Sequence, residues 1–492
     1  MTLGHALRLV AALVTLVALA ACLPIPTTRL DVELPEPEYV LPPEEVRVDY
    51  LSLPGYPEPH TPERYNRALY LRYYRGAQPA ETIVVLVPGI SGGATSLDVF
   101  ARQLVASSED LEVWAVDRRS NLLEDRSVFL ASLRRGDPMP AYHYYVERAG
   151  EEDGFRSLPP ERLGFMAYWG LEVHLRDLHA VVRRARAEAK TVILGGHSLG
   201  ASLASFYAAF DFGEAAPEPG YRHIDGLMLI DGGLGRTGGY GRDNLFAVGP
   251  FSLAPTAPEL EAGLGNPYFS LGRSPEHYAR LEAAALLALM APDELSPGGF
   301  FDFPVTNRAA AGLKVDDHYA LATAFSASVG HTVGAAYAGN LTAVILGGLE
   351  GVYSRSVVGV APGYDYVDWA RGDPARERTE LESVLRAWAM PETNFTEWYF
   401  PLRLLLDMSR LDLRLADAPG FVPTRSVRTP TLAVGAGRGL LASLDGFSAY
   451  INARPGTPFS AHILPGLTHF DIVMAEHNPL VPLSLLWLAG LP

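Results

Sequence analysis

The chain contains six short aliphatic runs that each lead into Gly, Asp or Pro. Runs of this length and composition are typical of parallel β-strands buried on both faces. Helix-like segments separate several of them, such as residues 172–189, whose apolar residues recur at helical spacing. The runs are residues 82–89, 111–117, 191–198, 225–233, 429–437 and 459–466. They predict an α/β protein with a mostly parallel, doubly wound sheet and a functional site at the carboxyl ends of the strands.

Two further stretches, residues 46–53 and 64–74, alternate apolar and polar side chains. This pattern predicts an antiparallel pair of strands before the parallel ones, with one face exposed to water. About 190 residues then separate the sixth predicted strand from the seventh, far more than a crossover connection needs.

We therefore expect a core formed by residues 46–234 and 426–492, interrupted by a large insertion at residues 235–425. Helical apolar stretches at 281–291 and 401–418 indicate that the insertion is mainly helical. Its apolar residues are explained either by a cap that binds an apolar substrate over the site or by the insertion's own core.

The third of the parallel runs ends in the sequence Gly196-His197-Ser198-Leu199-Gly200, followed by a helix-like segment. This is the GxSxG pattern of a nucleophile elbow, in which a serine sits on a sharp turn between a strand and a helix. The glycines leave room for the close approach of neighbouring backbone, and the helix N-terminus favours negative charge beside Ser198.

Residues 84–93, VVLVPGISGG, include the end of another predicted strand and the loop after it. This loop resembles the one that supplies half of an oxyanion hole. Together with the elbow and the chain order of nucleophile, acid and histidine, they make the core similar to the α/β-hydrolase fold, in its serine esterase and lipase branch. Pro88 stands where that family often has a His. The resemblance implies that the backbone amides of Ile90 and Leu199 hold the developing oxyanion.

The same resemblance places the general base in the loop after the last strand. His469, in ILPGLTHFDI, has that position. By contrast, His462 lies inside the strand pattern, and His477 follows one or two helical turns later. We expect His469 to take the Ser198 proton during attack and to return a proton to the leaving group.

The acid of the triad is less clearly marked. The family usually has it shortly after the seventh strand, where this chain offers Gly and Arg, and Asp445 comes several residues late. Asp231 ends the sixth strand, a position from which some lipases of the superfamily take their acid. We expect Asp231 to orient His469, with Asp445 as the alternative and Asp471 as a third candidate.

The N-terminus has Arg8, an apolar run over residues 9–19 and small residues before Cys22, the single cysteine of the chain. This is the pattern of an export signal, and the run is shorter than a membrane-spanning helix requires. Leu19-Ala20-Ala21-Cys22 resembles the lipobox of bacterial lipoproteins. We expect a signal peptide at residues 1–21, lipidation of Cys22 and a Pro-rich tether at 22–45, which predicts an exported lipoprotein on the outer membrane or cell surface.

The formal net charge is −16 and the basic residues are scattered, so a nucleic-acid partner is not expected. The cluster at residues 315–319, VDDHY, could offer metal ligands but is interpreted as a solvated turn, and no metal or cofactor is predicted. After the strand at 111–117, Arg118 or Arg119 could bind an acidic substrate group, although pairing with Glu124 or Asp125 is the preferred interpretation.

These features predict a lipid-anchored, exported serine hydrolase that cleaves small-molecule carboxylic esters with apolar groups through an acyl-enzyme. A non-catalytic binding or envelope protein with the same fold is the alternative. Thioesterase, peptidase and acyltransferase activities use the same residues, and the sequence does not choose among them.

Overall fold

The computed structural model describes residues 37–76, 80–233, 247–248, 251–252, 254–269, 274–319, 326–338, 356–416 and 418–491. The predicted signal peptide 1–21, Cys22 and the tether as far as residue 36 lie outside the described residues. The last part of the tether contacts the core, because the Val40 amide donates to the Ala106 carbonyl at 2.8 Å. No helix in the described ranges is long and apolar enough to cross a membrane.

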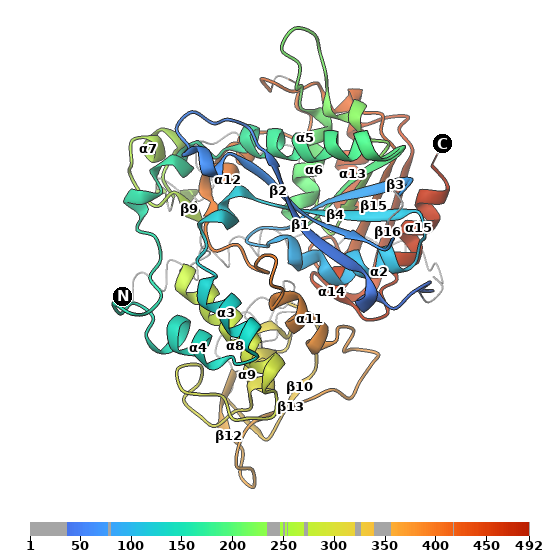
Figure 1. Ribbon diagram of the computed structural model, residues 1–492. Coiled ribbons are helices and arrows are strands. Elements are labelled where there is room, and N and C mark those ends of the chain that lie inside the picture. Colours follow the sequence, from blue (N-terminus) through green and yellow to red (C-terminus); the bar gives the residue numbers. More distant parts are fainter. Residues whose placement is uncertain are drawn as a thin grey trace.

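An eight-stranded sheet lies at the centre of the molecule (Figure 1), with the order β1-β2-β4-β3-β5-β6-β15-β16. Strand β2 runs antiparallel to its two neighbours, and all other neighbouring pairs are parallel. The strands are β1 (Arg47–Pro54), β2 (Arg67–Tyr74), β3 (Thr82–Val87), β4 (Leu111–Asp117), β5 (Thr191–His197), β6 (Gly226–Ile230), β15 (Thr431–Arg438) and β16 (Phe459–Thr468). This is the topology of the α/β-hydrolase fold, so the predicted fold class is confirmed.

Helices cover both faces of the sheet because alternate strand residues point to opposite sides. In β3, Val84 and Leu86 pack into the apolar cluster that contains α2 and α15, whereas Ile83 and Val85 pack against α5 and α6. Figure 1 shows these two layers. The helices are α2 (Asp98–Ala106), α5 (Leu171–Glu188), α6 (Leu199–Ala209), α13 (Asp445–Ala453), α14 (Asp471–Met474) and α15 (Leu480–Ala489).

The region between β6 and β15 contains both helices and short strands. Its helices are α7 (Ala257–Glu261), α8 (Pro275–Met290), α9 (Asn307–Val315), α11 (Leu381–Trp388) and α12 (Leu402–Ser409). Its strands form two-stranded sheets: β7 (Ala247–Val248) with β8 (Phe251–Ser252), β9 (Tyr268–Phe269) with β14 (Phe400–Pro401), β10 (His331–Val333) with β13 (Asp368–Ala370), and β11 (Ala335–Ala338) with β12 (Ser356–Val360).

The inserted residues divide between two parts of the molecule. Helices α8, α9 and α11 form the lower lobe of Figure 1, together with α3 (Ser127–Arg135) and α4 (Met139–Tyr142) from between β4 and β5. The Tyr142 hydroxyl, for example, donates to the Gly298 carbonyl at 3.0 Å. Helix α12 instead packs beside α5 on the core. The lower lobe is therefore not built from residues 235–425 alone.

The interpretation of residues 315–319 as a solvated turn is wrong. Asp316 and Asp317 are buried, with 0% and 2% of their surface exposed. Asp316 accepts hydrogen bonds from the backbone amides of residues 329–330, and Asp317 forms an ion pair with Arg438 at the end of β15. These partners compensate for the loss of hydration and tie the lower lobe to the core.

Candidate active site

Ser198 lies on the sharp turn that the GxSxG pattern predicts. Strand β5 ends at His197 and helix α6 begins at Leu199, with Ser198 between them at φ 59° and ψ −122°. A positive φ is unusual for a residue with a side chain, so the surrounding structure must hold it. The Ser198 amide donates to the Ile230 carbonyl of β6 at 2.9 Å, which fixes the turn against the neighbouring strand.

Two glycines of the pattern allow this turn to pack. A Cβ atom on Gly196 would lie 2.2 Å from the carbonyl carbon of Gly200, and a Cβ on Gly200 would lie 2.0 Å from the Val87 carbonyl oxygen. Both contacts are with backbone, which cannot move aside as a flexible side chain can. The reason that the sequence suggests for these glycines, close approach of backbone, is the one found in the structure.

Asp231 follows β6 and forms a hydrogen bond with His469, which follows β16. The His469 Nδ1 lies 2.6 Å from the Asp231 Oδ2, and both side chains are almost fully buried. Because a carboxylate accepts, Nδ1 carries the proton and Nε2 is left with its lone pair.

Three backbone amides hold the Asp231 carboxylate in place. Ala436 and Leu441 donate to its Oδ1 at 3.0 and 2.9 Å, and Leu440 donates to its Oδ2 at 2.9 Å. Burial would raise the pKa of Asp231, but the hydrogen bond and charge of His469 and the amides of Ala436 and Leu440 outweigh it and lower the pKa. The carboxyl is thus kept ionised beside the imidazole.

His197, the residue before Ser198, packs against His469. The ring centroids lie 4.3 Å apart, and the His197 Nε2 donates to the His469 carbonyl at 2.8 Å. Burial, reinforced by the charge of His469, lowers the pKa of His197 to about 3, so this ring stays neutral. His197 links the elbow to the loop of His469, a role that sequence reasoning missed.

The other two candidate acids lie elsewhere. Asp445 is exposed in the first turn of α13. Asp471 is buried, but it accepts hydrogen bonds from Ser328 and Thr379 of the insertion and from the Thr468 amide. It anchors the His469 loop to the insertion, while Asp231 alone among the three has a hydrogen bond with His469.

The loop over residues 88–93, between β3 and α2, lies against Ser198. A Cβ on Gly89 would be 3.1 Å from the Ser198 Cβ and 3.5 Å from its Oγ. The backbone amides of Ile90 and Leu199 have no hydrogen-bond acceptor among the described residues. Two amide donors next to a serine hydroxyl are able to stabilise negative charge on an oxygen bound there.

Arg118 holds this loop from behind. Its guanidinium donates to the carbonyls of Pro88, Gly89 and Gly92, at 2.8, 3.1 and 3.2 Å. Because a trans peptide points its N–H opposite to its C=O, the Gly89 carbonyl bond turns the amide of Ile90 away from Arg118.

The predicted partners of the two arginines are wrong. Arg118 pairs with Glu397 of the insertion at 2.7 Å, and Arg119 pairs with Asp177 of α5 at 2.6 Å. Glu124 and Asp125 bind other groups: Glu124 accepts from the Trp398 amide and Asp125 from the Tyr144 hydroxyl. Both guanidinium groups are buried in ion pairs inside the protein, although the Arg118 Nε has no hydrogen-bond partner among the described residues. Their charge is therefore already neutralised by Glu397 and Asp177.

A segment of the insertion completes the support of the loop. The Gly93 amide donates to the Phe395 carbonyl at 2.8 Å, and the Glu397 amide donates to the Ser91 carbonyl at 2.9 Å. Burial, partly offset by Arg118, raises the pKa of Glu397 to about 7. Sequence reasoning missed Glu397, and the only signal for this pair was an arginine directly after a buried strand.

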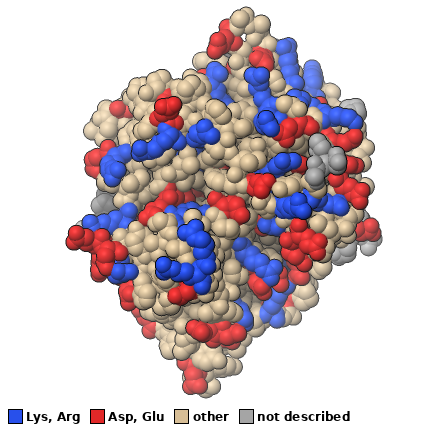
Figure 2. Space-filling view, in the orientation of Figure 1, with Lys and Arg blue, Asp and Glu red and all other residues tan. Residues whose placement is uncertain are grey.

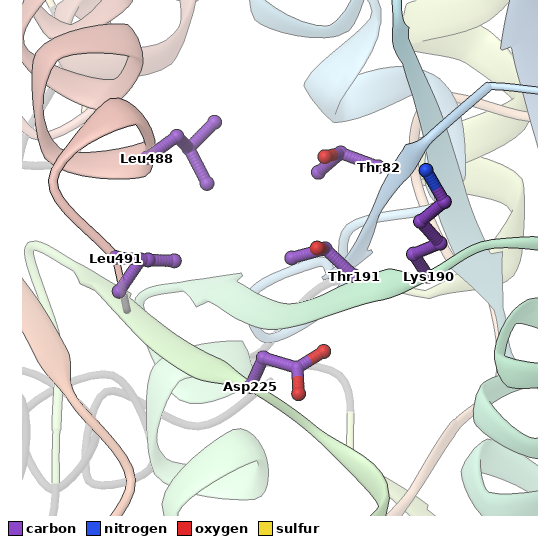
Figure 3. Close-up of a pocket in the computed structure, with 6 residues that line it drawn as sticks. All are labelled: Thr82, Lys190, Thr191, Asp225, Leu488 and Leu491. Atoms are coloured by element: carbon purple, nitrogen blue, oxygen red, sulfur yellow. The ribbon is translucent and has the colours of Figure 1, made fainter.

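A pocket of about 330 Å³ lies at the other end of the sheet (Figure 3). Thr82 and Thr191 line it, and they are the first residues of β3 and β5. Ser198 follows the last residue of β5, so this pocket is separate from the candidate active site. On the face shown in Figure 2, basic and acidic side chains are interspersed.

No family model matches the sequence, and no curated protein matches it. Solved structures resemble the chain at low sequence identity. A Sulfolobus solfataricus protein described as a lipase has a TM-score of 0.48 and 16% identity, over 90% of this chain and 94% of that one. A Bradyrhizobium elkanii haloalkane dehalogenase variant has 0.38 and 11%, over 90% and 97%. A Thermogutta terrifontis esterase has 0.36 and 11%, over 90% and 99%.

Proposed function

We propose that this chain with the α/β-hydrolase fold is a serine hydrolase that cleaves carboxylic esters. The observation that carries the proposal is the hydrogen bond between Asp231 and His469 beside the strained turn of Ser198. A buried carboxylate that fixes one histidine tautomer next to an activated serine is the arrangement that acyl transfer requires. A purely binding protein has no need for all three groups.

In the first half of the reaction, Ser198 Oγ attacks the ester carbonyl carbon while the His469 Nε2 takes the hydroxyl proton. The carbonyl oxygen becomes an oxyanion, which the amides of Ile90 and Leu199 stabilise; each such donor contributes about 3 kcal/mol. The C–O bond to the leaving alcohol then breaks, and the alkoxide receives the proton from His469.

In the second half, water attacks the acyl-enzyme. His469 takes a proton from the water, the same amides stabilise the second oxyanion, and the proton returns to Ser198 Oγ as the carboxylic acid leaves. Asp231 stays ionised throughout and stabilises the imidazolium of His469 that forms in each half of the reaction.

The test is labelling with a fluorophosphonate probe, followed by hydrolysis of p-nitrophenyl esters of increasing acyl length. Ser198→Ala should lose all labelling and about 10⁵–10⁶-fold in kcat. Ser205→Ala is the matched control, because Ser205 lies on α6, the helix that follows Ser198, and donates to the Ala201 carbonyl. Equal labelling of both variants, or none of the wild type, would favour the binding-protein alternative.

The substrate class is the finer part of the proposal. We propose small esters with an apolar acyl group, as the apolar stretches of the sequence suggest. The apolar residues of the insertion that the structure describes pack largely in a buried core, so the acyl-length series is what tests this point. Matched esters, thioesters and amides of one acyl group separate esterase from thioesterase and peptidase activity. Faster turnover of the thioester or amide would replace the ester assignment while leaving the roles of Ser198 and His469 intact.

We also propose that the chain is exported and anchored by a lipid on Cys22. The support is the short apolar segment before a single cysteine at the lipobox position. In a bacterial host, Cys22→Ser should release the protein from membranes or leave the precursor uncleaved. Unchanged partitioning of the variant into detergent would contradict this proposal without affecting the catalytic one.

A further inference from the structure

Two histidines and a glutamate come together on the side of the sheet that carries α5 and α6. His179 lies in α5, Glu218 lies in the loop between α6 and β6, and His223 ends the short helical turn η8 (Gly220–His223). One ligand atom from each residue lies within 4.8 Å of the others. His223 precedes the first residue of β6, whereas Asp231 follows its last, so this cluster is at the opposite end of the strand from the candidate active site.

The distance between His223 and Glu218 fits an ion pair and also fits two ligands of one metal ion. The His223 Nε2 is 3.1 Å from the Glu218 Oε1. The buried Nε2 makes no hydrogen bond of good geometry in the described chain, although the Glu218 carboxylate is close enough to oppose the lowering of its pKa by burial. Two neighbouring ligands on a tetrahedral zinc ion, with bonds of about 2.0–2.1 Å, lie about 3.3 Å apart.

The ring of His179 is held in a fixed orientation. Its Nδ1 is hydrogen-bonded to the Tyr207 hydroxyl at 2.9 Å, and the ring stacks on Phe212 with centroids 3.9 Å apart. With Nδ1 engaged, Nε2 is the nitrogen left to bind. A hydrogen bond on the second ring nitrogen is the usual way in which proteins orient a metal-binding histidine.

Hydrogen bonds within the loop hold the backbone of Glu218 in place. The Asp211 carboxylate accepts the Glu218 amide at 2.7 Å, and the Phe212 amide donates to the Glu218 carbonyl at 3.0 Å. Although the Glu218 side chain is exposed, its backbone is therefore fixed beside the two histidines.

The charges around the cluster favour neutral imidazoles. Burial lowers the pKa of His179 to about 3, and burial also lowers the pKa of His223 although Glu218 opposes that shift. Arg183 and Arg186 lie nearby and oppose a cation, so we expect micromolar rather than nanomolar affinity.

We propose that His179, Glu218 and His223 form a binding site for a divalent transition metal, zinc by the choice of donors. Two imidazoles and one carboxylate leave a fourth position for water. The ion would join α5 to the loop that enters β6. Since the chain has one cysteine, an intrachain disulfide cannot provide such a cross-link. The proposal is independent of the hydrolase assignment, because it involves neither Ser198 nor the residues around it.

The experiment uses the purified full chain after chelator treatment. Zinc binding is measured by calorimetry, cobalt binding by visible absorption, and the Tm is recorded with and without zinc. The wild type should bind one ion per chain and melt at a higher temperature with zinc, because a ligand of the folded state stabilises it. His223→Ala should abolish binding, and Glu218→Gln should weaken it about 10–100-fold.

His318→Gln is the matched control, because Asp316, Asp317 and His318 form the other group of potential ligands in the described ranges. There the carboxylates are already bound by Arg438 and by backbone amides. The control should bind zinc as the wild type does. Absence of binding by the wild type, undiminished binding by Glu218→Gln or His223→Ala, or loss confined to His318→Gln would each overturn the proposal. Glu218 is exposed, so Glu218→Gln keeps the test decisive if His223→Ala fails to fold.

Discussion

The two sides of Ser198 are built in different ways. On one side, Asp231 and His469 are held by loops at the ends of β6, β15 and β16, so the core fold supplies every partner of the carboxylate. On the other side, the loop over residues 88–93 is held by Arg118, by Glu397 and by backbone from residues 395–397 of the insertion. The partners of the Asp231 carboxylate thus all belong to the core, although Asp471 ties the His469 loop to Ser328 and Thr379 of the insertion, whereas the loop over residues 88–93 is held mainly by the insertion.

This difference changes what removal of the insertion would test. A deletion of residues 235–425 takes away the partners of Arg118, Ser91 and Gly93 as well as any surface that binds substrate. Loss of activity after such a deletion would therefore not identify the insertion as a substrate cap. Single substitutions on each side of Ser198 separate the two contributions.

The largest effect is expected on the core side. Asp231→Asn should lower kcat by up to about 10⁴-fold with the fold intact, because an amide can hold the wrong histidine tautomer. Steady-state ester hydrolysis and circular dichroism measure the two quantities. Asp445→Asn is the control and should have nearly wild-type kcat, since Asp445 is exposed in α13. The reverse order of losses would transfer the acid role to Asp445.

A smaller effect is expected on the insertion side. Arg118→Lys keeps the charge but loses the fork that reaches three carbonyls, so kcat should fall roughly 10–100-fold with little change in KM. Arg119→Lys alters the neighbouring residue, which pairs with Asp177 rather than with the loop. If both variants lost the same activity, Arg118 would be a structural residue and not a positioning one.

The pH dependence of stability should distinguish Glu397 from a carboxylate whose pKa is the same in the folded and unfolded chain. Burial raises the pKa of Glu397 to about 7, so the folded chain binds this proton more tightly than the unfolded chain does. The contribution of Glu397 to stability is then greatest below about pH 4.5, falls as the pH rises to about 7, and is constant above that.

Glu397→Gln removes this dependence. The Tm of the variant relative to wild type should therefore rise between pH 5 and pH 7.5. Glu377→Gln should shift in the opposite sense at lower pH, because hydrogen bonds from His331, Gly372 and Asp373 overcome burial and lower the pKa of Glu377. A pH-independent difference for Glu397→Gln would show that Glu397 stays ionised beside Arg118.

The smallest effect is expected where the lower lobe meets β15. Asp317→Asn removes the charge that pairs with Arg438. Because the Arg438 side chain is 36% exposed, water screens this ion pair. We expect less than about a threefold change in kcat and a decrease of a few degrees in Tm at most. A loss as large as that of Arg118→Lys would mean that the core side also depends on the insertion.

The core side could be predicted from the sequence because its signals are local. Ser198, Asp231 and His469 each follow a buried strand, and parallel strands bring their carboxyl ends to one edge of the sheet. That Asp231 rather than Asp445 lies beside His469 also follows from where a strand ends. The prediction of a solvated turn at 315–319 failed because burial of Asp317 depends on Arg438, a partner more than a hundred residues away.

The support of the oxyanion loop could not be predicted for the same reason. Arg118 and Glu397 are 279 residues apart, and no periodicity or motif connects them. The nearby carboxylates Glu124 and Asp125 were the natural partners on distance along the chain. In the folded chain, however, Glu124 accepts a hydrogen bond from the Trp398 amide and Asp125 accepts one from the Tyr144 hydroxyl, so neither pairs with Arg118.

The bonds between residues 91–93 and 395–397 have a consequence for the order in which the protein is made. During synthesis, strands β3 to β6 and the Ser198 turn are made before residues 395–397, and His469 is made after them. A partly synthesised chain thus carries the serine without its base and without a fixed oxyanion loop. On the proposed function, a chain that stops before residue 469 cannot hydrolyse an ester, because it lacks the proposed general base.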